Sequence, residues 1–171
     1  MPHKRDYLLN FYNMFLWVDP GVRKLWYALI DGNKKVIDAG ILLSDENSPT
    51  RMDQFARMHE IYEFFVELVA KYPIRAVAME KLFFTTSNQN NAEYVYGVRG
   101  SLGMLFRKHT IPLYEYTPPQ LKKAITGTGL ASKRAMQLMT QKLFALEQAP
   151  TRHDTADALG LAWLALQRTK K

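Results

Sequence analysis

The sequence contains no cysteine, which excludes disulfide bonds and metal sites built from thiolates. It also lacks any run of about 20 apolar residues, the length that a membrane-spanning helix needs. Residues 7–18 are interrupted by Asn10 and Asn13 and carry no small-residue cleavage site, so we expect no signal peptide. These absences predict a soluble, cytoplasmic protein with no membrane partner, and an origin in an organelle or a virus stays open.

Acidic residues are the minority among the charged side chains. Sixteen acids stand against 23 lysines and arginines, so the formal net charge is +7. This excess favours an anionic partner, and nucleic acid is the first candidate. The alternative is a protein whose lysines only keep its surface hydrated. A length of 171 residues is enough for one domain with a core on both faces of a sheet.

We expect residues 1–13 to form an extension before a single domain of residues 14–171. Three apolar runs joined by turn sequences, including Asp31-Gly32, predict three antiparallel strands, and alternating helices and strands follow. The fold class is therefore α/β, with a mixed five-stranded sheet (three antiparallel strands, then two parallel) flanked by helices. The predicted strands cover residues 14–18, 24–30, 36–43, 74–79 and 111–116, and the predicted helices cover residues 51–72, 92–108 and 154–167, with two more that begin at residues 118 and 133.

Four carboxylates stand at the ends of predicted elements. Asp19 follows the first strand and Glu80 follows the fourth. Asp154 and Asp157 open the last helix, three residues apart on one face. Each has an ordinary explanation when taken alone: a turn, a solvated loop, or a helix N-terminus that favours acids. Together they suit hard divalent cations. Two Mg²⁺ ions about 4 Å apart, for which Mn²⁺ could substitute, would activate water and neutralise a phosphoryl transition state.

Basic residues flank a glycine-bearing loop and the start of a predicted helix. Ammonium groups and backbone N–H groups could converge on phosphate there. A hydrated basic surface is the alternative explanation. The residues concerned are Lys122, Lys123, Lys133 and Arg134.

Two adjacent aromatic residues, Phe83 and Phe84, lie between Glu80 and a polar run over residues 85–91. Core burial is the usual fate of phenylalanine, but this polar segment offers little core. A wedge or a stacking platform for unpaired bases is the functional alternative, with stacking worth roughly 1–3 kcal/mol per base.

Three further features have more than one explanation. Arg99, in a predicted helix, could reach DNA or pair within its helix. Gly97, Gly100 and Gly103 share one face of that helix, which predicts close packing against the sheet, another helix or a partner subunit. His153, beside Asp154, could be a base, a phosphate contact or an outer-shell partner of the metal, although a lone histidine in a loop usually has none of these roles.

Several segments together resemble the RuvC family of Holliday junction resolvases, in the same order along the chain from about residue 14 to 167. The resemblance implies an RNase H-like fold, a homodimer and magnesium-dependent symmetric nicking of opposed strands in four-way DNA junctions. Branch-migration proteins would be possible partners. The segments are Val18-Asp19-Pro20-Gly21, residues 78–84 (AMEKLFF), Gly97-Val98-Arg99-Gly100, residues 114–118 (YEYTP), the stretch from Lys122-Lys123 through Gly127-Thr128-Gly129 to Lys133, and residues 153–159 (HDTADAL).

The resemblance also implies roles for individual residues. Lys122 and Lys133 match basic residues near the scissile phosphate. Phe83 matches an aromatic residue that stacks on junction bases, but the loop here is one residue longer, so Phe84 is an equal candidate. The family's catalytic acids are matched by Asp19, Glu80, Asp154 and Asp157.

Two tryptophans depart from the family pattern. Trp17 and Trp26 stand where the family usually has glycine, and both add bulk near Asp19. We therefore expect the sheet near this acid to pack differently from that of the family.

Two other functions stay open from the sequence. One is a related RNase H-like nuclease, such as a YqgF-like protein that acts on RNA, but the Phe-Phe loop and the Gly-Thr-Gly segment favour a junction resolvase. The other is a nucleic-acid-binding module that cleaves nothing, against which the four intact acids argue.

Overall fold

The computed structural model describes residues 13–43, 51–81, 92–150 and 153–169, with the backbone alone for residues 51, 52, 153 and 154. Residues 1–12, nearly all of the predicted extension, lie outside this part. No helix within the described ranges is long and apolar enough to cross a membrane. The elements are β1 (Met14–Asp19), β2 (Lys24–Asp31), β3 (Val36–Leu43), α2 (Arg51–Lys71), β4 (Ile74–Glu80), α3 (Ala92–Lys108), β5 (Leu113–Tyr116), α4 (Pro118–Thr126), α5 (Lys133–Phe144) and α6 (His153–Arg168).

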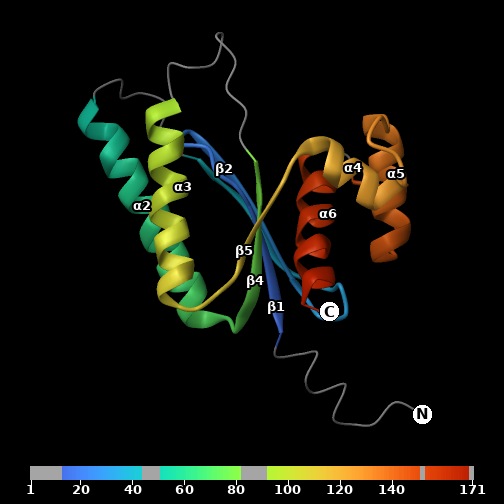
Figure 1. Cartoon of the computed structure of the whole chain (residues 1–171), viewed down its shortest axis with the longest axis horizontal. Helices are drawn as coiled ribbons and strands as arrows, with labels where there is room; N and C mark the ends of the chain where they lie inside the picture. The colour runs from blue at the N-terminus through green and yellow to red at the C-terminus, as the bar shows by residue number, and fades with distance from the viewer. Residues whose placement is uncertain (1–12, 44–50, 82–91, 151–152, 170–171) are drawn as a thin grey trace.

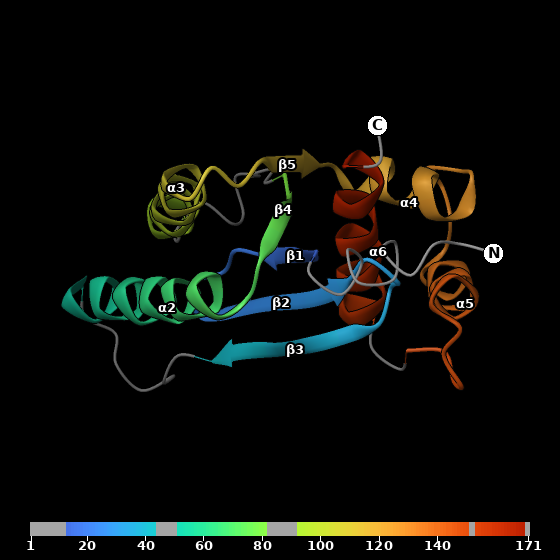
Figure 2. The same cartoon turned by 90° about the horizontal axis from the view of Figure 1, so that it is seen from below.

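The strands form one sheet in the order β3-β2-β1-β4-β5 (Figure 1, Figure 2). β2 pairs antiparallel with both β1 and β3, while β4 pairs parallel with both β1 and β5. The predicted sheet of three antiparallel strands followed by two parallel strands is confirmed. β1 is the central strand, where the antiparallel and parallel parts meet.

Helices cover both faces of this sheet. In Figure 1, α2 and α3 lie on one side, and α4, α5 and α6 lie on the other. Because side chains alternate along a strand, β1 contributes to two separate cores. Leu16 and Val18 pack in the cluster that contains Phe65 of α2. Phe15 and Trp17 pack in the cluster beneath α6.

The bulk of Trp17 is accommodated by small residues around it. The indole is only 1% exposed. Its partners on the adjacent strands are Ala28 of β2 and Ala78 of β4, and Ala162 of α6 belongs to the same buried cluster. These alanines leave volume for a large ring in a close-packed core. The pairing of β1 with β2 continues through Asp19, so the departure from the family pattern leaves the strand intact.

The three glycines of α3 have different surroundings. A Cβ on Gly97 would lie 2.5 Å from the Met58 methyl carbon of α2, so the absence of a side chain lets these two helices approach. A Cβ on Gly100 or Gly103 would have no other atom of the described residues within 4 Å. Within the described chain, the prediction of close packing therefore holds for Gly97 alone.

Candidate active site

Asp19 and Glu80 are the last residues of two adjacent parallel strands, β1 and β4. The pairing of these strands joins Val18 to Met79, so each acid follows one residue later at the same edge of the sheet. Both side chains are partly exposed. Both strands end one residue later than predicted, so each acid belongs to its strand.

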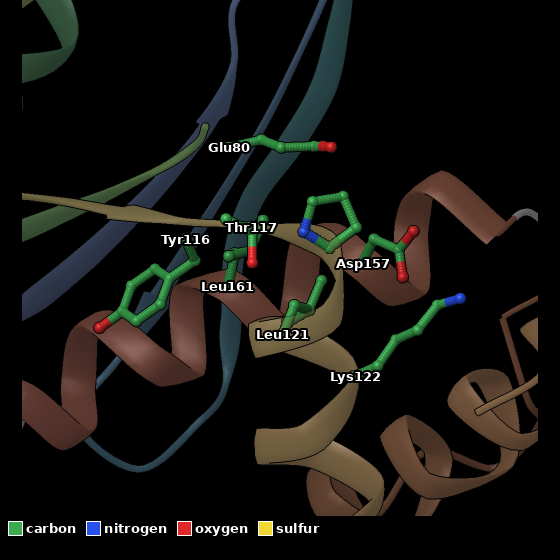
Figure 3. Close-up of a pocket in the computed structure, with 8 residues that line it drawn as sticks. Glu80, Tyr116, Thr117, Leu121, Lys122, Asp157 and Leu161 are labelled. Carbon is green, nitrogen blue, oxygen red and sulfur yellow. The ribbon is translucent and has the colours of Figure 1, made fainter. Parts of the chain in front are cut away.

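Side-chain alternation places both acids on the face of the sheet that α6 covers. Trp17 of β1 and Ala78 of β4 belong to the cluster beneath α6, and the acids stand two residues beyond them. Asp157 comes from α6 itself, near the start of that helix. Figure 3 shows the carboxylates of Glu80 and Asp157 extending to the same side of the site.

One pocket has Glu80, Asp157 and Lys122 in its wall. It joins the ends of β4 and β5 to the N-terminal parts of α4 and α6, and Asp19 lies on the next strand of the sheet. Lys122 extends its ammonium group toward the side where the Asp157 carboxylate lies (Figure 3). The other lining residues are Tyr116, Thr117, Pro118, Leu121 and Leu161.

Hydrogen bonds at both ends of α4 hold the helix that carries Lys122. Thr117 Oγ1 accepts a hydrogen bond from the Gln120 N–H at 3.3 Å, and Gln120 Oε1 accepts one from the Thr117 N–H at 2.9 Å. This capping box satisfies two of the free donors at the helix start. Gly127 ends the helix in the left-handed region, with φ of 85°, where glycine is favoured.

Close packing of α4 on α6 brings Lys122 near Asp157. At Gly160 of α6, a Cβ would lie 3.1 Å from a methyl carbon of Leu121 and 3.2 Å from a side-chain carbon of Ile125, both on α4. The missing side chain therefore lets the two helices approach. Their contact brings the first turns of both helices to one pocket.

The other three predicted basic residues, Lys123, Lys133 and Arg134, are exposed and are not part of the pocket wall. Lys133 begins α5, as predicted, and Ser132 is its N-cap; Ser132 Oγ accepts a hydrogen bond from the Ala135 N–H at 3.1 Å. These positions agree with the predicted loop and helix start. Phosphate binding by the three side chains stays a prediction.

The guanidinium of Arg99, on α3, contacts two strands. Its Nη1 donates a hydrogen bond to the backbone carbonyl oxygen of Glu80 at 2.7 Å. Its Nη2 forms an ion pair with the carboxylate of Glu115 on β5. The side chain is 13% exposed. Burial lowers the pKa of Arg99, while the charge interaction with Tyr96 acts in the opposite direction. An arginine stays protonated at neutral pH despite such a shift.

The structure does not describe the side chains of four predicted site residues, and for two of them it does not describe the backbone either. These are Phe83 and Phe84, which fall in the range 82–91, and His153 and Asp154, of which only the backbone is described. α6 begins at His153, so Asp154 stands in its first turn, about one turn before Asp157. The expected pairing of the two aspartates on one helix face is consistent with this backbone.

The donors at the site fit a hard divalent cation. Asp19, Glu80 and Asp157 offer carboxylate oxygens, which Mg²⁺ and related ions prefer. Among the residues that the structure describes, no three acidic or histidine side chains form a group that could hold an ion. The Asp154 side chain is not part of that set, and it would add a fourth carboxylate at the start of α6.

The sequence analysis gave no role to Glu115, Tyr116 or Thr117, although all three lie at or beside the site. β5 pairs Tyr116 with Glu80, so its carboxyl end reaches the same edge of the sheet as β4. The parallel arrangement of the last two strands was the signal that could have identified them. The contact between Glu115 and Arg99 depends on side-chain packing and has no local signal.

The order of the strands and the acids at the ends of β1 and β4 define the class of RNase H-like nucleases. A family model described as crossover junction endodeoxyribonuclease RuvC matches residues 15–164. The chain belongs to this family. The predicted fold class and the predicted enzyme class, an endodeoxyribonuclease, are thereby confirmed, and family membership implies the use of a divalent metal ion.

Individual relatives agree with this membership. The RuvC of Alkaliphilus metalliredigens is 41% identical over 152 residues, which cover 87% of this chain and 90% of the relative. The RuvC of Thermosipho melanesiensis is 35% identical over 156 residues, which cover 90% and 96%. Among solved structures, Thermus thermophilus RuvC in complex with a Holliday junction substrate is 25% identical, with a TM-score of 0.74 and coverage of 91% of this chain and 96% of that chain.

Proposed function

We propose that this protein resolves four-way DNA junctions by nicking two opposed strands, in a reaction that depends on Mg²⁺. The observation that carries this proposal is the pocket in which Glu80, Asp157 and Lys122 meet at the ends of parallel strands. Two acids can hold a cation there, and a neighbouring ammonium group can contact a phosphate. The junction-bound structure of the related Thermus thermophilus RuvC supports a junction as the substrate.

Asp19, Glu80, Asp154 and Asp157 would hold two Mg²⁺ ions, for which Mn²⁺ could substitute. When bound, such ions lower the pKa of water and neutralise charge that develops on the phosphate. The carboxylates keep the ions at the end of the sheet. Lys122 offers hydrogen-bond donors to a phosphate oxygen from the other wall of the pocket.

Residues around the pocket would bind the rest of the junction. Lys133 and Arg134 are exposed at the N-terminus of α5, where backbone N–H groups add to the attraction for phosphate, and Lys123 is exposed on α4. For Phe83 and Phe84 we propose stacking on unpaired bases, and for His153 an outer-shell contact to the metal. Arg99 was predicted to bind DNA, and its observed contacts suggest the different role argued below.

We further propose that the protein acts as a homodimer in the cytoplasm, with branch-migration proteins as possible partners. α3 supports self-association because it has an exposed strip in which Tyr96 is 54% exposed and Met104 is 76% exposed. Gly100 and Gly103 lie on the same side of the helix and leave open space beside its backbone. A second copy could approach closely there, and two active sites would then face two strands of one junction.

The test is cleavage of a synthetic four-way junction with Mg²⁺, run beside linear duplex, flap and RNA–DNA hybrid substrates. We expect symmetric nicks in the junction and little cleavage of the other three. Asp19→Asn and Glu80→Gln should bind the junction with wild-type affinity and fail to cut it. Equal cutting by the wild type and both variants would refute the metal site, and preference for the hybrid would indicate an RNA substrate.

A further inference from the structure

The side chain of Arg99 links three elements next to the active site. It starts on α3, donates to the carbonyl oxygen at the end of β4 and pairs with a carboxylate on β5. The carbonyl belongs to Glu80, the residue whose side chain enters the pocket. Arg99 therefore contacts the backbone of a site residue from the side of the sheet opposite α6.

The surroundings of Arg99 differ from those expected of a side chain that binds DNA. Its side chain is 13% exposed, whereas Lys123, Lys133 and Arg134 are all classed as exposed. Two of its donor groups already have acceptors within the protein. A contact with phosphate would have to use the remaining N–H groups of a guanidinium that is mostly buried.

We propose that Arg99 is a positioning residue that fixes the end of β4, so that the Glu80 carboxylate is held toward the metal. Glu115 assists by holding the guanidinium in place. This inference rests on the proposed function, since it takes Glu80 to be a metal ligand.

The physical reason is the position of Glu80 at the point where its strand ends. The N–H of the next residue, Lys81, donates to the carbonyl oxygen of Tyr116 at 2.8 Å, so β5 supports this end of the strand from one side. Arg99 supports the same peptide from α3. A backbone held from two directions restricts where its side chain can point, and a misplacement of about 1 Å at a catalytic site can cost roughly 100-fold in rate.

Arginine is suited to this task in a way that lysine is not. The guanidinium is planar and presents several donors at fixed angles, so it can serve a carbonyl and a carboxylate at once. A lysine ammonium could approach either acceptor but would not reproduce the same fork. Arg99→Lys should therefore restore only part of the function.

The test compares Arg99→Gln, Arg99→Lys and Glu115→Gln with the wild type. The charge-matched control is Lys35→Gln, an exposed residue in the hairpin between β2 and β3, at the other end of the sheet. Three quantities are measured: Mn²⁺ binding to the protein without DNA, junction binding in EDTA, and single-turnover cleavage as a function of Mg²⁺ concentration.

We expect Arg99→Gln to weaken Mn²⁺ binding by roughly 10-fold to 100-fold, as loss of an outer-shell partner does, and to slow cleavage to a similar degree. Junction affinity in EDTA should stay within about two-fold of the wild type. In Mn²⁺ binding and in cleavage rate, Arg99→Lys should fall between the wild type and Arg99→Gln. Glu115→Gln should weaken both quantities less than Arg99→Gln does, and Lys35→Gln should match the wild type.

Two results would overturn the inference. If Arg99→Gln weakens junction binding and lowers its salt dependence by about one phosphate contact, then Arg99 binds DNA. If Arg99→Gln and Glu115→Gln both bind Mn²⁺ and cut like the wild type, then the contacts have no positioning role. Glu80→Gln, run in parallel, separates the two proposals, because normal cutting by that variant would refute the proposed metal site itself.

Discussion

Lys122 is the basic residue whose side chain lines the same pocket as Glu80 and Asp157. Lys123, its neighbour in sequence, is exposed and does not line this pocket. Charge and spacing alone did not separate the two lysines, whereas the family resemblance matched Lys122, together with Lys133, to basic residues near the scissile phosphate. The structure places Lys122, and not Lys123, in the wall of the pocket, so the proposed contact with the reacting phosphate falls to Lys122.

Lys122→Gln should lower the single-turnover cleavage rate by roughly 100-fold to 1,000-fold, the usual effect of removing one donor to a charged transition state. Lys123→Gln should leave that rate unchanged at saturating enzyme and reduce the salt dependence of junction binding by about one contact. Cleavage rates and salt titrations of both variants measure this. The account is contradicted at this position if the two substitutions have the same effect on the rate.

Local signals predicted most of the residues that start the elements, whereas most of the predicted ends differ from the observed ends by one residue. Asp31-Gly32 predicted the hairpin, and Asp31 Oδ1 accepts hydrogen bonds from the N–H groups of Asn33 and Lys35 at 2.8 Å each. Ser132, of a residue type that favours the N-cap, caps the helix that was predicted to begin at residue 133. The role of Gly160 had no such signal, because it depends on which helix lies opposite.

At the level of the elements, the pairing of β2 with β3 shifts the pKa of Tyr27, a residue of β2. Burial and the nearby Asp38 carboxylate, which also accepts a hydrogen bond, raise the pKa of Tyr27 to about 12. The ring lies against Gly40 on β3 and packs 5.0 Å from Phe64 of α2, measured between ring centroids. The neutral phenol is therefore favoured in the folded state.

This shift predicts a loss of stability at high pH. The folded pKa lies above the value of 10.0 for a free tyrosine, so the stabilisation is complete below pH 10 and is lost as the pH rises through 12. A shift of this size corresponds to about 2–3 kcal/mol. Tyr27→Phe should lower the free energy of unfolding by about 1 kcal/mol at pH 8, because the hydrogen bond to Asp38 is lost. The variant should not show the further loss of stability that ionisation of Tyr27 causes at high pH.

The measurement is urea unfolding of the wild type and of Tyr27→Phe at pH 8 and at pH 11.5. All other tyrosines are present in both proteins, so their ionisation cancels in the difference between the two free energies of unfolding. The free-energy gap between wild type and Tyr27→Phe should shrink or reverse at the higher pH. A gap that stays constant would show that Tyr27 ionises equally easily in the folded and unfolded states.

At the level of the whole molecule, one sheet lies between two helical layers, with α3 in one layer and α4 and α6, which carry pocket residues, in the other (Figure 1). The sequence predicted the layers because strands and helices alternate, but it did not predict that β1 pairs in parallel with β4, which is what places Asp19 and Glu80 at one edge of the sheet. It could not predict that Gly100 and Gly103 face open space. That depends on how α3 is rotated against α2, which no local pattern determines.

The proposed dimer gives a prediction at this scale. Met104 is 76% exposed on the strip of α3, and a charge there would have to be buried if two copies met on this surface. Met104→Glu should therefore shift the protein from dimer to monomer in sedimentation experiments and should uncouple the two nicks. Leu138→Glu, at an exposed position on α5 outside the proposed interface, is the matched control. A wild-type protein that sediments as a monomer, both free and on junction DNA, would refute the dimer.

The central claim is that acids from β1, β4 and α6 form one metal site, and anomalous X-ray scattering from crystals soaked in Mn²⁺ tests it most directly. We predict Mn²⁺ peaks coordinated by Glu80 and Asp157, with Asp19 as a further ligand, and no such peaks in crystals of Glu80→Gln. Saturating Mn²⁺ that leaves this pocket empty in the wild type, or that binds there equally well in Glu80→Gln, would contradict the account.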